Sequence, residues 1–137
     1  MMLDPESSTG GCLCGGVRYV VRGALRDVIA CHCSQCRRTS GHFVAATSTP
    51  LEQFSLTESE TLRWYLSSDR AKRGFCSRCG GNLFWQPLDE SPARISITAG
   101  TLDPPTRLRM SEHIFVADKS DYYNIEDGLP QSPRWPE

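Results

Sequence analysis

Seven cysteines fall in three short clusters, and no other feature of this 137-residue chain restricts its fold so strongly. The clusters are Cys12 and Cys14, then Cys31, Cys33 and Cys36, then Cys76 and Cys79. Cysteines one or two residues apart in a tight turn can direct their sulfurs at one ion, and zinc prefers tetrahedral thiolate coordination. Glycine follows two of the clusters, at Gly15 and Gly80, and lets the backbone turn back without a Cβ clash. Each cluster therefore predicts a metal-binding turn.

The expected cellular environment favours metal binding over disulfides. The first eight residues have neither the positive charge nor the apolar stretch of a secretory signal, and no window approaches the ~20 apolar residues that cross a bilayer. We therefore expect a cytoplasmic location and no membrane partner, in a compartment where thiols stay reduced. An odd number of cysteines also could not pair completely.

The ligand count divides the cysteines into two unequal sites. Four protein ligands close a structural zinc site, whereas three leave one position for water or substrate. Only the cluster at 31–36 holds three cysteines, so the other two clusters must combine to complete a tetrahedron. We expect two zinc ions per chain, one held by four cysteines and one by three; the sets are Cys12, Cys14, Cys76 and Cys79, and Cys31, Cys33 and Cys36.

Two other interpretations of the cysteines stay open at this stage. Some of them could be small buried hydrophobic residues, since free cysteine is commonly buried. Alternatively, both ions could be structural, with His32 or another side chain closing the second site. Alternation along a strand would instead point the His32 ring away from the metal.

The rest of the chain predicts one mostly β domain. Hydrophobic residues make up 39% and charged residues 23%, within the range of globular proteins. Period-two patterns predict strands over 17–22, 61–66, 94–98 and 113–116, with short helical turns at 34–39 and 51–54. We expect a single domain over 1–137 with small antiparallel sheets, a core at about 10–127, a polar N-terminal tail and a proline-rich C-terminal tail.

The charge balance excludes one class of partner. Fifteen basic and sixteen acidic side chains give a formal net charge of −1, so no large positive field exists to hold nucleic acid or anionic lipid. Nucleic acid is therefore not an expected partner. Small molecules are, and a homodimer is compatible with the sequence.

Four segments resemble the family of glutathione-dependent formaldehyde-activating enzymes and centromere protein V. They are GGCLCGGVRY at 10–19, ACHCSQCRRTSG at 30–41, KRGFCSRCGGNLFW at 72–85 and HIFVADKSDYYNIEDGLP at 113–130. The resemblance implies an Mss4-like (β-tent) fold around zinc. It also implies that the four-cysteine set holds the structural zinc and that Cys31, Cys33 and Cys36 hold the catalytic one.

The family's named activity implies a carbon–sulfur lyase resembling S-(hydroxymethyl)glutathione synthase. We expect a thiol such as glutathione to occupy the open position and to add to a small aldehyde such as formaldehyde. A zinc ion with three thiolates polarises a carbonyl weakly but can lower the pKa of a fourth thiol.

Substrate contacts are expected beside the third ligand. Arg37 and Arg38 could pair with a substrate carboxylate, and Thr39 could line the same wall, although hydroxyls in such loops often cap turns. Tyr122 and Tyr123 lie where family members often carry an aromatic, and could close over the open site.

Two functions from other classes compete with the enzyme. One is a non-catalytic zinc module that binds a partner protein. The other is a redox sensor in which Cys31, Cys33 or Cys36 releases zinc and forms a disulfide.

Overall fold

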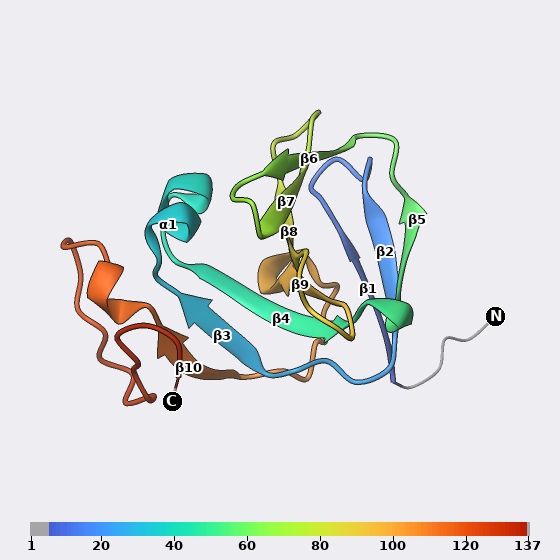
Figure 1. The fold of residues 1–137 in the computed structure, drawn as a ribbon. Helices are drawn as coiled ribbons and strands as arrows, with labels where there is room; N and C mark the ends of the chain where they lie inside the picture. The colour runs from blue at the N-terminus through green and yellow to red at the C-terminus, as the bar shows by residue number, and fades with distance from the viewer. Residues whose placement is uncertain (1–5, 137) are drawn as a thin grey trace.

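The computed structural model describes residues 6–136 and contains short strands, one helix and three 3-10 turns (Figure 1). The strands are β1 (Ser7–Gly11), β2 (Arg18–Arg22), β3 (Val28–Cys31), β4 (Val44–Pro50), β5 (Phe54–Glu58), β6 (Leu62–Leu66), β7 (Ala71–Cys76), β8 (Asn82–Pro87), β9 (Arg94–Thr98) and β10 (Met110–Ile114). The other elements are α1 (Ser34–Ser40), η1 (Leu51–Gln53), η2 (Ala99–Thr101) and η3 (Val116–Asp118). The mostly β fold predicted from the sequence is confirmed.

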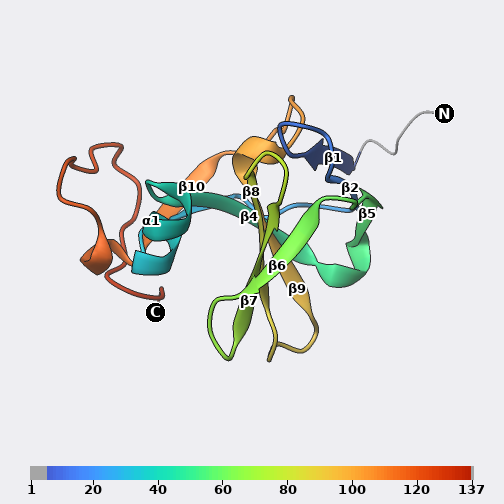
Figure 2. The same ribbon diagram turned by 90° about the horizontal axis from the view of Figure 1, so that it is seen from above.

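The strands form a small sheet and a large one. The small sheet has the order β1-β2-β5, and the large one β10-β3-β4-β9-β8-β7-β6. In both views the small sheet lies at one end of the molecule, while α1 and the C-terminal segment lie at the other (Figures 1 and 2). No helix within 6–136 is long and apolar enough to cross a membrane.

Every strand pair is antiparallel, as expected, except one. β10 pairs with β3 in parallel, with a register shift between Met110 and Glu112. Parallel neighbours need a long connection, and here the chain between them forms the other five strands of the large sheet and one strand of the small sheet. The parallel pair is a non-local contact, which period-two patterns cannot reveal.

The predicted elements differ from the observed ones mainly at β10. The predicted 94–98 strand and both helical turns coincide with β9, α1 and η1 to within one residue. The strand predicted over 113–116 instead ends at Ile114, because Phe115 adopts a left-handed backbone with φ 56° and is the N-cap of η3.

Both chain ends of the described region are paired to strands. β1 begins at Ser7, before the core boundary expected at residue 10, and pairs with β2. At the other end, the His113 N–H donates to the Pro130 carbonyl at 2.9 Å and the Ser132 N–H donates to the His113 carbonyl at 2.9 Å. The segment expected to be a C-terminal tail therefore runs alongside the end of β10.

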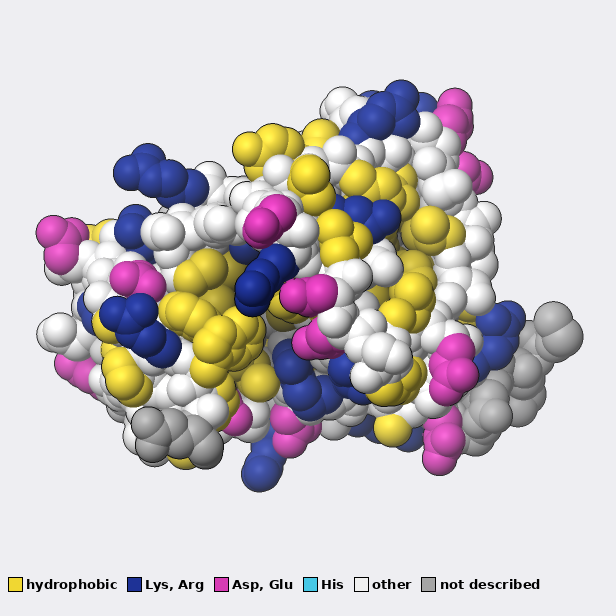
Figure 3. Space-filling view, viewed as in Figure 1, with side chains coloured by type: hydrophobic (Ala, Val, Ile, Leu, Met, Phe, Trp, Pro, Cys, Tyr) yellow, Lys and Arg dark blue, Asp and Glu magenta, His cyan; other side chains and the backbone are white. Residues whose placement is uncertain are grey.

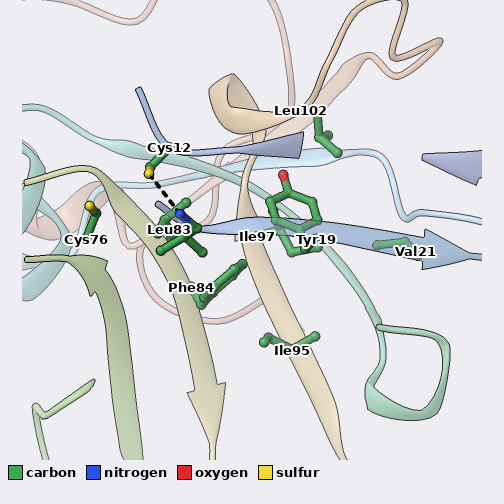
Figure 4. Close-up of a cluster of buried hydrophobic side chains, with 10 residues drawn as sticks. Cys12, Tyr19, Val21, Cys76, Leu83, Phe84, Ile95, Ile97 and Leu102 are labelled. Atoms are coloured by element: carbon green, nitrogen blue, oxygen red, sulfur yellow. Dashed lines mark hydrogen bonds between the residues drawn. The ribbon is translucent and has the colours of Figure 1, made fainter. Parts of the chain in front are cut away.

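The hydrophobic core lies between the small sheet and one face of the large sheet (Figure 4). Tyr19 of β2 is 1% exposed and stacks on Phe54, while Phe84 of β8 packs edge-on against both rings. The other buried core residues are Cys12, Val17, Val21, Cys76, Leu83, Ile95, Ile97 and Leu102. Two cysteines at the edge of this core connect it to the first metal-binding cluster.

The opposite face of the large sheet carries a different set of side chains. Successive side chains of a strand point to opposite faces, so cross-strand partners share a face. Cys31 pairs with Val44, Ser48 with Ser96, and Trp85 with both Ser96 and Arg73. The strand register thus assembles one surface from five strands, at one end of which lies the three-cysteine cluster.

Candidate functional site

Four cysteines distant in sequence form the first cluster. The Sγ atoms of Cys12, Cys14, Cys76 and Cys79 all lie within 4.8 Å of one another. The Cys12–Cys14 sulfur distance is 3.7 Å and the Cys14–Cys76 distance is 3.5 Å. A tetrahedral zinc with bonds of about 2.3 Å needs sulfurs about 3.8 Å apart. The spacing therefore fits a zinc ion.

Backbone N–H groups surround these sulfurs. The Cys12 Sγ accepts from the Val17 N–H at 3.4 Å, and the Cys76 Sγ accepts from the Arg78 and Cys79 N–H groups at 3.4 and 3.3 Å. Such donors stabilise a thiolate, so the two turns are organised for charged sulfur ligands.

Three cysteines around the start of α1 form the second cluster. Cys31 ends β3, Cys33 is the N-cap of α1, and Cys36 lies in its first turn. Their Sγ atoms also lie within 4.8 Å of one another. The Cys33 sulfur accepts the Cys36 N–H at 3.3 Å, and hydrogen bonds from the Cys31 and Cys36 thiols lower the pKa of Cys33. This cluster could hold a metal, with no fourth Cys, His, Asp or Glu ligand among residues 6–136.

His32 is not available to close this second cluster. Its side chain is fully buried, with Nε2 2.9 Å from His113 Nδ1 and Nδ1 2.7 Å from the Tyr123 hydroxyl. Both ring nitrogens are thus engaged away from the cysteines. This arrangement disfavours the interpretation in which His32 completes a second structural site.

The contact between the histidines extends to a carboxylate. The His113 Nε2 atom lies 2.7 Å from Asp127 Oδ2, and this hydrogen bond lowers the pKa of Asp127. A charged Asp127 can only accept, so His113 donates from Nε2 and its Nδ1 accepts from His32 Nε2–H. His32 Nδ1 then accepts the Tyr123 O–H. Burial lowers the pKa of His32 to about 4, which keeps its ring neutral near pH 7.

A cavity of about 330 Å³ adjoins the second cluster, on the strand face described above. Cys31 and Cys36 line one end. The walls are Arg26, Ile29, Val44, Ala46, Ser48, Arg73, Trp85, Pro87, Glu90, Arg94, Ser96, Ile114, Trp135 and Pro136. In Figure 3, hydrophobic side chains gather between α1 and the C-terminal segment, with charged side chains beside them toward the centre. The volume lies at the small end of the range for small-molecule sites.

Three arginines and one glutamate make the cavity walls positively charged. Arg94 donates from Nε to the Ser48 hydroxyl at 3.1 Å, and Arg26 donates to the Ala46 carbonyl at 2.9 Å. Partial desolvation of its guanidinium and the nearby charge of Arg94 hold the pKa of Arg26 below its ordinary value, although the residue as a whole is exposed. Two neighbouring cations of this kind suit a carboxylate ligand.

The substrate contacts predicted from the sequence lie outside this cavity. Arg37 donates from Nε to the Asp118 carbonyl at 2.8 Å. Arg38 and Thr39 line a second cavity of about 300 Å³, and the Thr39 hydroxyl donates at 2.9 Å to the Gln35 carbonyl one turn earlier in α1. Arg73 lines both cavities and is the residue between them.

The predicted aromatic lid is also placed elsewhere. Tyr123 contacts His32, and the Tyr122 hydroxyl contacts His42 Nδ1, whereas neither tyrosine lines the cavity beside Cys31 and Cys36. Trp135, in the C-terminal segment, lines that cavity and packs edge-on against Phe115.

Sequence reasoning missed the arginines of the cavity. Arg73 and Arg94 lie far from the three-cysteine cluster in sequence, and only strand pairing brings them to it. Arg26 precedes Cys31 by only five residues, but no local pattern marked it as a cavity residue. The available signal was alternation, because Arg94 and Ser96 share the face opposite to Ile95 and Ile97.

Comparisons with known proteins agree with the cysteine geometry. The family described as glutathione-dependent formaldehyde-activating enzyme matches residues 7–118. An uncharacterized lyase of Schizosaccharomyces pombe is 34% identical over 117 residues, which covers 85% of this chain and 83% of that protein. A crystal structure of a Rhodobacter sphaeroides protein superposes with a TM-score of 0.58 at 26% identity, covering 75% of this chain and 99% of that one. The chain therefore belongs to the glutathione-dependent formaldehyde-activating enzyme family.

Proposed function

We propose that this protein is a zinc-dependent carbon–sulfur lyase that joins a small aldehyde to a thiol, or releases it. Glutathione and formaldehyde are the proposed substrates. The observation that carries the proposal is the position of the cavity, which ends at Cys31 and Cys36 of an incomplete ligand set. A sealed four-cysteine site elsewhere explains the remaining cysteines without a catalytic role.

The two cysteine sets would hold two zinc ions with different tasks. The set of Cys12, Cys14, Cys76 and Cys79 fits a structural ion, because four thiolates leave no position for substrate. The set of Cys31, Cys33 and Cys36 fits a catalytic one. A zinc ion held there would lower the pKa of a substrate thiol, so that it reacts as a thiolate near neutral pH.

The chain's own residues would bind and orient the thiol. The Arg26 and Arg94 guanidinium groups can pair with a glutathione carboxylate, while Trp85, Val44 and Ile114 cover its carbon chain and exclude water. We keep a second set of proposed substrate contacts, but they are weaker candidates because a ligand would have to extend past Arg73 to reach them. They are Arg37, Arg38 and Thr39. A cytoplasmic location and a homodimer also stay predictions.

A comparison of two cysteine variants tests the proposal. We expect two zinc ions per wild-type chain and catalysed exchange between formaldehyde, glutathione and their adduct, measured by NMR. Cys33→Ser should keep one zinc and the fold but lose catalysis, whereas Cys76→Ser should lose the fold. Full catalysis in Cys33→Ser would refute the proposed reaction centre.

A binding experiment separates the enzyme from its alternatives. Calorimetry of the zinc-loaded protein with glutathione should give a heat of binding that Arg94→Met weakens and Arg22→Met does not, because Arg22 is exposed on β2 and lines neither cavity. Two inert zinc ions and no heat with any small thiol would instead favour a protein-binding module.

A further inference from the structure

Arg73 is a buried cation in a position that the structural ion pairs do not explain. It lies in the middle of β7 and is only 7% exposed. Arg73 forms no ion pair with a carboxylate of residues 6–136. A buried guanidinium without a carboxylate partner needs another negative charge nearby.

The negative charge is supplied by the three-cysteine cluster. The Arg73 Nη1 and Nη2 atoms both lie 3.9 Å from the Cys36 Sγ, and Nη2 donates to the Gln35 side-chain oxygen at 3.3 Å. The Nη edge of the guanidinium therefore faces the Cys36 sulfur.

The other donor of this guanidinium has no partner. Arg73 Nε is buried, and no acceptor within the described part of the chain reaches it. Most buried polar groups in proteins are hydrogen-bonded, so an exception at a cavity wall points to a ligand. Because Arg73 lines the cavity that ends at Cys31 and Cys36, and its Nη atoms lie 3.9 Å from the Cys36 Sγ, the guanidinium group lies beside the place where a thiol sulfur would react.

We infer that Arg73 is a catalytic residue that donates a hydrogen bond to the aldehyde-derived oxygen of the substrate. The inference rests on the proposed lyase function and assigns this reaction a donor that the cysteines cannot provide. A positioned donor at a developing oxyanion is among the strongest contributions that an enzyme makes to such additions.

The chemical step needs a donor at that oxygen. In the addition, the thiolate sulfur forms a bond to the aldehyde carbon, and the π electron pair of the carbonyl moves to oxygen. Arg73 stabilises the resulting alkoxide, which then takes a proton from water to give the hydroxymethyl thioether. In the reverse direction, hydroxide removes this proton, the C=O bond re-forms, and the S–C bond breaks to release the thiolate.

A carboxylate of the thiol is a less suitable partner for Arg73. Arg26 and Arg94 already present two guanidinium groups to the cavity, with the Arg94 Nη atoms free of hydrogen bonds to residues 6–136. Arg73 alone of the three contacts a cysteine sulfur. A guanidinium donor held this close to the cysteines therefore suits an oxygen only one carbon away from the substrate sulfur.

The experiment compares Arg73→Met, Arg73→Lys and Arg63→Met with the wild type. Arg63 is an exposed arginine on the neighbouring strand β6 that lines neither cavity, so it is a matched control. For each protein, zinc per chain, glutathione affinity by calorimetry and kcat for adduct breakdown are measured. We expect Arg73→Met to lower kcat on the order of 10²–10³-fold, with zinc content and glutathione affinity unchanged. Arg73→Lys keeps the charge and should lose less.

Three outcomes would overturn the inference. An unchanged kcat in Arg73→Met would show that the substrate oxygen does not need this donor. Loss of zinc or of glutathione binding in both Arg73 variants would show that the residue only balances the cysteine charge. If the wild type itself fails to catalyse adduct exchange, the proposed lyase function fails first and the role of Arg73 fails with it, which distinguishes the two failures.

Discussion

At the residue scale, the turns of the four-cysteine cluster depend on glycines with a left-handed backbone. Gly15 follows Cys14, Gly80 follows Cys79, and their φ values are +79° and +77°. The Gly80 N–H donates to the Cys76 carbonyl at 2.9 Å, which closes the turn around the sulfurs. A Cβ at Gly80 would meet no atom within 4 Å, so the demand is conformational and not steric.

Replacement of Gly80 by Ala should therefore destabilise the zinc-loaded protein by about 1–2 kcal/mol, the cost of a left-handed conformation for an L-residue. Urea unfolding measures this difference. Gly100→Ala is the control, because Gly100 also has open space around its Cα but is not among the positive-φ glycines. Equal losses in the two variants would contradict the conformational argument.

At the scale of elements, side-chain hydrogen bonds attach the segment after η3 to the end of β3. Tyr123 donates to His32, His32 to His113, and His113 to Asp127, with the direction set by the charged carboxylate. His32 lies between two ligand cysteines, so this chain also orients the peptide that carries them.

Tyr123→Phe should destabilise the fold by about 1–3 kcal/mol, because it leaves the buried His32 Nδ1 without a donor. Tyr122→Phe is the matched control. The Tyr122 hydroxyl contacts His42, which is exposed, so water can replace that partner at little cost. Chemical denaturation of both variants at pH 7 provides the test, and a stability of Tyr123→Phe equal to that of Tyr122→Phe would count against the hydrogen-bonded chain.

The pair of Arg18 and Asp103 connects β2 to the segment after η2. Hydrogen bonds from Arg18 and Thr9 lower the pKa of Asp103. A carboxyl whose folded pKa is depressed contributes stability above its unfolded pKa of about 3.9 and loses this contribution as the pH falls through the lower folded value.

Asp103→Asn should cost about 0.2–1 kcal/mol at neutral pH, since both side chains are partly exposed and screened by solvent. The difference from wild type should stay constant from pH 8 to about pH 5 and close at lower pH. Urea unfolding across this range measures it, with Asp89→Asn as control because its ion pair with Arg70 is exposed and 3.9 Å long. If the difference in free energy of unfolding between wild type and Asp103→Asn grew at low pH, it would contradict a depressed pKa of Asp103 in the folded protein.

At the scale of the whole molecule, the four-cysteine cluster connects the two sheets. Cys12 follows β1 of the small sheet, whereas Cys76 ends β7 of the large one, and both are buried at the edge of the core. A structural zinc can contribute on the order of 10 kcal/mol of apparent folding free energy. Its loss would separate the sheets that enclose the core.

A chelator titration should therefore release the two proposed zinc ions in two stages. The first ion, from the three-cysteine site, should leave without loss of near-UV circular dichroism, and the second should leave together with the tertiary signal. Zinc release and circular dichroism are followed on the same sample. Unfolding that accompanies the first ion would contradict the division into an open and a closed site.

The sequence by itself determined the class of fold and predicted the two cysteine groups that the structure brings together. Short cysteine spacings lie within single turns, and period-two patterns lie within single strands. Both could therefore be recognised from short stretches of sequence. Their grouping into four and three followed from counting ligands, and the family resemblance agreed with that count.

Only the tertiary structure decided what surrounds the proposed reaction centre. Arg26, Arg73 and Arg94 come from three separate segments, and strand register brings them to one cavity with Cys31 and Cys36. Arg37 and Arg38 were predicted because they are neighbours of Cys36 in sequence, but α1 turns them away from that cavity. Local patterns specify which atoms can bind a metal, whereas non-local pairing of strands specifies which charges face the cavity.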